Sequence, residues 1–313
     1  MPVARVSVII PTHNRAAMLP RAVESARAAG EGVEVVVVDD ASTDETPDIC
    51  RALAGVRYLR LKRNSRQAAA RNAGIAATDS EFVAFLDDDD LRLPGSLAAQ
   101  IAALERDPGA GFVYGPVLLG DPKTCEPTGE LSPEECPAGD IFWQLVERNF
   151  IHLPSVVARR RCLEAVGQFE PSLTGAEDWD MWMRLAERYT VAAVREPVAI
   201  YRTFTRASGQ TSSNRLKMCR VSAATQARAL SLPRALAAPR SQRKRARRHG
   251  LDMMTMSLLT QAHIDLADRL PRAAFRNFAG ALRLNPRRAF TLRAFKWFLF
   301  SPWDERRGEQ RGA

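Results

Sequence analysis

Acidic side chains follow two apolar, strand-like segments of this sequence. Asp39 and Asp40 follow the first of these segments, and four consecutive aspartates, 87–90, follow the second. Adjacent carboxylates repel one another, and a hard cation such as Mg²⁺ or Mn²⁺ relieves that repulsion while holding a substrate's phosphates. Alternate residues of an extended turn face the same way, so Asp87 and Asp89 can bind one metal ion together. The alternative is a solvated acidic loop.

The first acidic pair is open to two interpretations. Asp39 and Asp40 could cap a helix that is expected to begin near Thr43. Ser42 and Glu45, however, already have the spacing of a capping box. A cap supplied by Ser42 would leave a carboxylate free to accept a hydrogen bond from a nucleotide base or ribose.

One cation and a second acidic pair are further candidates for chemistry. Arg71 lies in a helix of small residues, where it could form a surface ion pair or stand near a nucleotide's base or diphosphate. Glu177 and Asp178 precede Trp179 and Trp182 on another predicted helix. Acidic residues are favoured at helix starts, so this pair could be purely structural. The tryptophans are more often core residues than sugar platforms.

Alternating strand and helix signals must position these groups. Apolar runs end before polar clusters, and helical segments with capping signals, such as Asn14 before 16–29, lie between them. The pattern predicts an α/β fold, an open, mostly parallel sheet with helices on both faces. Ligands of such sheets bind beyond the carboxyl ends of the strands, which brings the candidate residues together. The expected strands are 6–10, 34–38, 56–61, 82–86 and 112–117, the expected helices 16–29, 43–54, 65–77 and 94–107, the expected loop 120–140, and the expected all-helical region 216 onward.

The composition limits the class of protein. The 313 residues are 46% hydrophobic, enough for one large domain or a domain with an appendage. No apolar run reaches the roughly 20 residues of a spanning helix, and no signal-peptide pattern is present. Five scattered cysteines form neither a zinc framework nor a disulfide ladder. These features predict a cytoplasmic protein with reduced thiols.

Charge is distributed unevenly along the chain. Residues 1–200 hold 21 Lys+Arg and 30 Asp+Glu, whereas residues 201–313 hold 24 and 6. A basic tail indicates an anionic partner, either a membrane surface or nucleic acid. The basic cluster 240–248 lacks interleaved aromatics, which makes nucleic acid the weaker choice. Apolar and aromatic residues at 253–259 and 295–300 fit peripheral attachment to an anionic membrane, or else packing onto the catalytic domain.

Several motifs, in order, resemble those of one enzyme family. VSVIIPTHNR, VVVVDDASTDET and ARNAGIAATDSEFVAFLDDDD, followed by a segment ending in GAEDWDMWMRLAER, are similar to family 2 glycosyltransferases with the GT-A fold. The resemblance covers most of residues 4–202. It implies a GT-A domain over 1–214, with a nucleotide-sugar half over 1–118 and an acceptor half over 119–214. A basic helical region, 215–313, would follow.

The resemblance also implies roles for single residues. Asp178 matches the catalytic base of inverting members, with Glu177 beside it, and Asp90 matches a carboxylate that orients the site. The Asp87–Asp89 pair matches the DXD motif that binds Mn²⁺ or Mg²⁺. The implied nucleotide-sugar contacts are Pro11, Asp39, Asp40, Arg71, Asp87 and Asp88.

The implied function is metal-dependent transfer of a sugar, by default from a UDP-hexose, to a glycan or lipid-linked acceptor with inversion. Many relatives carry a histidine shortly after the motif that Tyr201 and Arg202 match, and this chain does not. Arg202, Arg206 and a flexible stretch, 208–213, could instead close over the diphosphate. The alternatives are a catalytically silent nucleotide-binding or scaffolding protein, and a nucleotidyltransferase. The latter needs a glycine-rich phosphate loop that residues 11–15 lack.

Overall fold

The computed structural model describes residues 4–203 and 214–290. The chain divides into two compact units. The first contains every described strand, and the second contains the helices from residue 215 onward together with residues 146–148. The expected loop over the diphosphate, with Arg206, and the aromatic cluster at 295–300 lie outside the described residues.

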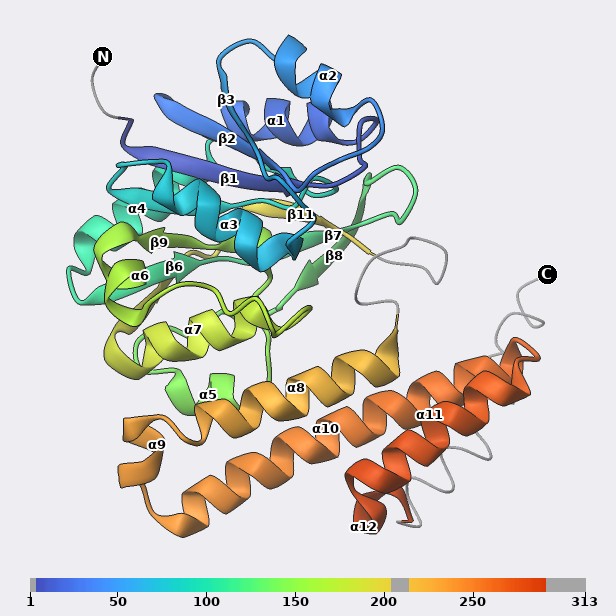
Figure 1. Ribbon diagram of the computed structural model, residues 1–313. Helices are drawn as coiled ribbons and strands as arrows, with labels where there is room; N and C mark the ends of the chain where they lie inside the picture. The colour runs from blue at the N-terminus through green and yellow to red at the C-terminus, as the bar shows by residue number, and fades with distance from the viewer. Residues whose placement is uncertain (1–3, 204–213, 291–313) are drawn as a thin grey trace. The chain divides into compact units, whose positions relative to one another are not determined.

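The first unit is built on a seven-stranded sheet (Figure 1). β1 pairs in parallel with β2 and β4, β2 with β3, and β6 with β10. Only β9 runs antiparallel to its neighbours, β4 and β6, so the expected mostly parallel sheet is confirmed. In spatial order the strands are β10 (Thr190–Ala193), β6 (Ala110–Tyr114), β9 (Val157–Arg159), β4 (Phe82–Phe85), β1 (Val6–Thr12), β2 (Val33–Asp39) and β3 (Val56–Arg60).

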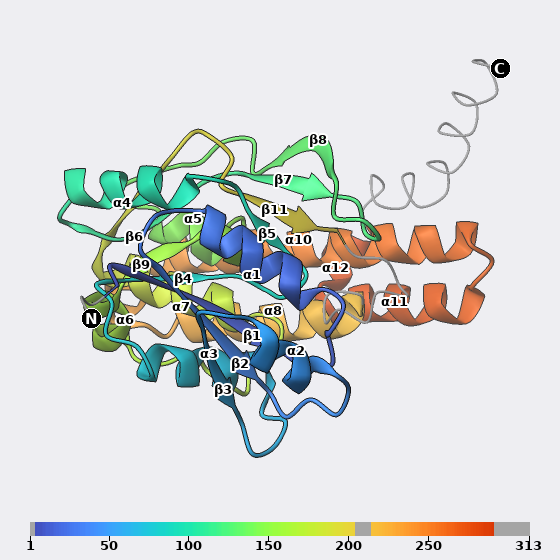
Figure 2. The same cartoon turned by 90° about the horizontal axis from the view of Figure 1, so that it is seen from above.

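Helices cover both faces of this sheet, which explains why β1 is buried along its whole length (Figures 1 and 2). Val8 and Ile10 belong to the core that α1 and α4 close. On the opposite face Ile9 meets α3 at Gly74, where a Cβ would lie 2.5 Å from the isoleucine. The helices of this unit are α1 (Leu19–Ala28), α2 (Thr46–Ala52), α3 (Arg66–Ala76), α4 (Ser96–Arg106), α6 (Arg160–Val166) and α7 (Glu177–Arg188), with a short 3₁₀ turn at Leu153–Ser155. A further helix, α5 (Phe142–Glu147), begins in this unit and ends in residues of the second.

A second sheet departs from the sequence prediction. Its order is β5 (Leu91–Arg92), β11 (Ala199–Arg202), β7 (Val117–Gly120) and β8 (Pro127–Ser132). The single strand expected at 112–117 is therefore two strands, β6 and β7, in different sheets. The expected loop at 120–140 contains β8, which is mostly exposed and forms by pairing with β7. An exposed strand containing proline and glycine carries no apolar pattern for a sequence to show.

The expected caps of the first two helices are wrong. α1 begins after Met18 and α2 after Glu45, neither with a side-chain cap. The side chains of the preceding loops bond each other instead. The Ser42 hydroxyl accepts a hydrogen bond from the Asn14 main-chain N–H (2.9 Å), and the Asn14 Oδ1 accepts one from the Thr43 N–H (2.8 Å). The loops after β1 and β2 are thus joined at the carboxyl edge of the sheet.

The second unit is helical, as expected. It comprises α8 (Arg215–Ala229), α9 (Pro233–Ala237), α10 (Arg240–Ala267), α11 (Pro271–Leu284) and α12 (Pro286–Ala289). α10 packs along both α8 and α11. A buried hydrogen bond from Asn277 Nδ2 to Asp265 Oδ2 (2.7 Å) joins α11 to α10. Within the described chain no helix combines the length and the apolarity that crossing a membrane requires.

Candidate active site

A buried arginine joins three elements that are far apart in sequence. Arg71, from α3, donates from Nη2 to Asp87 Oδ1 (2.6 Å) and from Nη1 to Glu177 Oε1 (2.8 Å). Its side chain is 2% exposed, and its guanidinium lies 5.8 Å from the centre of the Phe169 ring. Arg71 therefore connects the loop after β4 to the start of α7. Arg71 is therefore buried and does not form the surface ion pair that was the alternative.

A second buried arginine holds the other half of the acidic run. Arg202, at the end of β11, donates from Nη2 to Asp89 Oδ2 (2.5 Å), and its main-chain N–H donates to Asp90 Oδ1 (2.8 Å). Its Nη1 donates to the Pro122 carbonyl oxygen (2.8 Å). The second sheet thereby contributes a cation to the site, so that Asp87 bonds Arg71 while Asp89 and Asp90 bond Arg202.

The Asp39–Asp40 pair carries out structural work that the sequence interpretation did not assign to it. Asp39 is fully buried and accepts hydrogen bonds from the Ser42 N–H (2.7 Å) and the Tyr58 hydroxyl (2.9 Å). Asp40 accepts from the main-chain N–H groups of Ser65 and Arg66 (2.6 Å each), at the start of α3. The premise that a Ser42 cap frees one carboxylate is wrong, because both carboxylates are bonded. Asp40 instead fixes the helix that carries Arg71, and a nucleotide contact by either aspartate remains a prediction.

Of the predicted contacts Pro11 and Asp88, the second is bonded to the residue that follows the first. Pro11 is buried near the end of β1. The Thr12 hydroxyl donates to Asp88 Oδ2 (2.7 Å), which fixes the acidic run to the end of β1. The sequence analysis did not single out Thr12. Its only signal was its place between the strand and the polar segment.

Negative charge dominates the electrostatics of the site. Burial, and then the charge of Asp89, raises the pKa of Asp88 to about 7. Burial raises the pKa of Asp87 despite Arg71, and it raises the pKa of Asp90 well above its usual range. Burial, and then Glu177, raises the pKa of Asp178 to about 7. Each shift shows that the buried carboxylates are not fully compensated by the nearby cations.

Asp178 differs from its neighbour in its bonding. Glu177 is buried, bonds Arg71 and also accepts from the Gly175 N–H (2.6 Å). Asp178 Oδ1 accepts a hydrogen bond from the adjacent Trp179 N–H (2.7 Å). Asp178 is therefore the better placed of the two to take a proton, and Glu177 the better placed to position Arg71.

An aromatic cluster packs against the residues of the site. Trp182 of α7 stacks on Phe112 (5.5 Å between centroids) and lies 6.0 Å from Phe85. Phe169 meets Phe85 edge-on at 5.2 Å, on the same side as Arg71. Trp179 is also buried, and its indole N–H donates to the Leu145 carbonyl oxygen (2.7 Å). The expectation that both tryptophans of α7 are core residues is confirmed.

A tyrosine and a histidine pack against each other close to the acidic run. Burial, and then the charge of Asp90, raises the pKa of the Tyr201 hydroxyl. The His152 ring packs on Tyr201 with centroids 4.6 Å apart, and its Nε2 lies 2.8 Å from the Ser132 hydroxyl. Burial lowers the pKa of His152 to about 4, so the ring is neutral near pH 7. These contacts give His152 a structural role.

The donor set fits a divalent cation that a substrate helps to hold. Among the described residues no three Asp, Glu, His or Cys side chains are grouped as metal ligands. Asp87 and Asp89 are the predicted pair of ligands, and Mg²⁺ is often bound by one or two carboxylates with substrate phosphates and water. Asp90 Oδ2 is buried without a partner in the described chain, which shows that negative charge remains to be neutralised.

Part of the chain matches a known family of proteins. Residues 7–127 match the family model described as "Glycosyl transferase family 2". Over these residues the chain is similar to that family. An uncharacterized glycosyltransferase of Haemophilus influenzae is 26% identical over 209 residues, which are 63% of this chain and 68% of that protein. The succinoglycan biosynthesis protein ExoU of Rhizobium meliloti is 31% identical over 195 residues, 57% of this chain and 56% of that protein. In a relative from Rickettsia felis the match spans only 31% of the protein.

Solved structures show the same fold. A mannosyltransferase from Pyrobaculum calidifontis, in complex with GDP-Man and Mn²⁺, superposes with a TM-score of 0.61 at 20% identity, over 94% of this chain and 83% of that one. TarS of S. aureus, in complex with UDP-GlcNAc, superposes with a TM-score of 0.56 at 16% identity, over 89% and 91%. The GT-A fold expected from the sequence is confirmed.

Proposed function

We propose that this protein transfers a sugar from a nucleotide diphosphate-sugar to an acceptor hydroxyl. The observation that carries the proposal is the bonding of Arg71 to both Asp87 and Glu177. This bonding brings the acidic run after β4 beside the start of α7, where Asp178 lies. Carboxylates that can hold a metal–diphosphate group therefore adjoin a carboxylate that can accept a proton.

The chemistry is divided between these two carboxylate groups. Asp178 would deprotonate the acceptor hydroxyl, and its pKa of about 7 suits a general base near neutral pH. Asp87 and Asp89 would hold Mn²⁺ or Mg²⁺, which stabilises charge on a departing diphosphate. Attack on the side opposite the leaving group would invert the anomeric centre. Arg71 and Arg202 keep the carboxylates in place.

The donor is a nucleotide diphosphate-hexose, with UDP as the first choice. Family neighbours bound to UDP-GlcNAc and to GDP-Man support this class of donor. A relative named for succinoglycan biosynthesis supports a glycan acceptor, whether free or lipid-linked. For the helical unit we propose an anionic membrane surface as partner, because residues 214–290 hold 17 Lys+Arg and three Asp+Glu. The site would then work at the cytoplasmic face.

The deciding experiment is a panel of nucleotide sugars with Mn²⁺, read by thermal stabilisation and by hydrolysis of the donor. A ligand that binds only the folded state raises its stability by mass action, so even a slow enzyme reveals its donor. One donor should stabilise the protein and be hydrolysed. Stabilisation without any turnover would favour the catalytically silent alternative, and no stabilisation by any donor would refute the proposal.

A further inference from the structure

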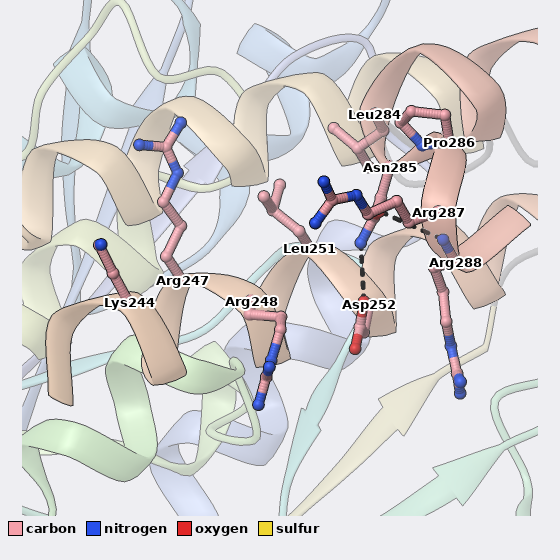
Figure 3. A pocket seen from close by; sticks show the side chains of 10 residues that line it. All are labelled: Lys244, Arg247, Arg248, Leu251, Asp252, Leu284, Asn285, Pro286, Arg287 and Arg288. Atoms are coloured by element: carbon pink, nitrogen blue, oxygen red, sulfur yellow. Dashed lines mark hydrogen bonds between the residues drawn. The ribbon is translucent and has the colours of Figure 1, made fainter. Parts of the chain in front are cut away.

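A basic groove lies on the helical unit, separate from the residues described above. One wall is a single face of α10, where Lys244, Arg247, Arg248 and Leu251 recur at helical spacing. The other wall is the segment from the end of α11 through α12, with Arg287 and Arg288. Figure 3 shows the cationic side chains extending from both walls. The groove has a volume of about 700 Å³.

Most of the positive charge of this groove has no acidic partner in the described part of the chain. Over residues 4–203 and 214–290, Lys244, Arg247, Arg248 and Arg287 form no ion pair. The lining includes one carboxylate, Asp252, and it accepts a hydrogen bond from Asn285 Nδ2 (2.7 Å). The groove therefore gathers cations on two walls while its one acid is used to join those walls.

This arrangement suits a compact, multiply charged anion. Guanidinium groups bind phosphate oxygens through paired N–H donors, and charge-assisted hydrogen bonds are among the strongest in proteins. The Asp252–Asn285 bond fixes the α12 segment against α10. Asn285 Oδ1 also accepts from the Arg288 main-chain N–H (3.2 Å), which orders the turn that carries the cations. A phosphate bound between the walls would remove the repulsion among them.

We propose that this groove binds the exposed phosphate monoester or diphosphate of a membrane lipid. The lipid source is favoured because Phe290, two residues beyond Arg288, is 69% exposed, and Phe275 on α11 is 74% exposed. Exposed aromatic residues beside cations are typical of surfaces that lie in a membrane interface. The inference rests on the proposed membrane partner and not on the transferase reaction.

The test is co-sedimentation of the full chain with vesicles of phosphatidylcholine containing either phosphatidic acid or phosphatidylserine, at matched surface charge. Phosphatidic acid presents a phosphate monoester, whereas the phosphate of phosphatidylserine is a diester. The groove variant combines Arg247→Gln with Arg287→Gln, one from each wall. The control combines Arg272→Gln with Arg276→Gln, two exposed α11 residues that do not line the groove. Donor hydrolysis, and the melting temperature with and without inorganic pyrophosphate, are measured for every protein.

The unaltered protein should prefer phosphatidic acid by about tenfold, the order expected for one charge-assisted phosphate contact. The control should keep that ratio, and the groove variant should bind both vesicles alike with its donor hydrolysis unchanged. Restoring charge with Arg247→Lys and Arg287→Lys should recover part of the preference.

Three results would overturn the inference. Equal binding to both vesicles by the unaltered protein would mean that diffuse charge binds the membrane and that the groove does not bind a lipid phosphate. Loss of the preference for phosphatidic acid in the control as well would mean that the groove is not the site that recognises the phosphate. Stabilisation by inorganic pyrophosphate without binding to either vesicle would mean that the source of phosphate is soluble, and the membrane partner would fall too.

Discussion

At the scale of single residues, the acidic run after β4 is the group of the site that most needs a bound cation to neutralise its charge. Asp89 shares Arg202 with the Asp90 carboxylate, and burial raises the pKa of both Asp87 and Asp90. Asp89→Asn should abolish most activity while the fold persists, because it removes a metal ligand and changes little volume. Turnover and melting temperature are measured in Mn²⁺. Full turnover of the unaltered enzyme in excess chelator would refute the metal role.

The base is also tested at a single residue. Asp178→Asn should lower kcat by roughly a hundredfold or more, the usual scale for losing a general base, with donor binding nearly unchanged. Glu177→Gln is the comparison, since Glu177 bonds Arg71 and should affect donor binding first. A normal rate in Asp178→Asn would assign the base elsewhere, with Glu177 next.

The same aspartate predicts a pH profile. Burial and then the Glu177 charge raise the pKa of Asp178 to about 7, and a base acts only when deprotonated. Activity should therefore rise as the pH increases through about 7 and level off above it. The profile of kcat/KM for the unaltered enzyme is compared with that of Glu177→Gln, in which one raising cause is removed. The midpoint should move to lower pH in that variant, and an unmoved midpoint would count against Asp178 as the titrating group.

The sequence predicts the role of a site residue only where its bonding partners are near it along the chain. A carboxylate run after an apolar strand indicates metal binding by local pattern alone. The partners of Arg71 lie 16 and 106 residues away, and no local pattern shows that one guanidinium joins Asp87 to Glu177. The hydrogen bonds of Asp40 could not be predicted for a similar reason, since the N–H groups that it accepts from are 25 and 26 residues further along the chain.

At the scale of elements, α3 has little freedom to move. A Cβ at Gly74 would lie 2.5 Å from Ile9 Cγ2 and 3.1 Å from Val38 Cγ2. Gly74→Val should therefore lower the free energy of unfolding by about 1–3 kcal/mol, as overpacking does. It should also weaken donor binding, because it displaces Arg71, which lies one helical turn before Gly74. Ala76→Val, at an exposed position of the same helix, is the matched control. Equal effects of the two variants in denaturant titrations and donor binding would contradict close packing as the cause.

Elements are predictable where burial imposes a pattern. β1 and β2 are largely buried and apolar, and their strands were expected within two residues of their bounds. β8 is exposed, so its residues show no periodicity and only its pairing with β7 makes it a strand. The break between β6 and β7 was missed because Gly115 and Pro116 lie inside one apolar run, where the chain passes from one sheet to the other.

At the scale of the whole molecule, the candidate site and the excess positive charge lie in different parts of the sequence. Every described residue assigned to the site lies between Pro11 and Arg202, within the first unit. Deleting residues 215–313 changes the formal net charge from +9 to −7. An acidic protein is repelled by an anionic leaflet, and a basic segment near the surface gains about 1 kcal/mol for each Lys or Arg.

The truncated protein should therefore keep Mn²⁺-dependent donor hydrolysis and lose binding to anionic vesicles. The full chain should bind these vesicles at low salt, and its binding should fall as salt rises, because the Debye length shortens from about 30 Å at 0.01 M to about 10 Å at 0.1 M. Co-sedimentation with anionic and neutral vesicles across a salt series measures this, and the melting curve of the truncated protein verifies that it folds. If the full chain failed to bind either vesicle type, the helical unit would have no role at a membrane, and a soluble acceptor would become the better expectation for the site.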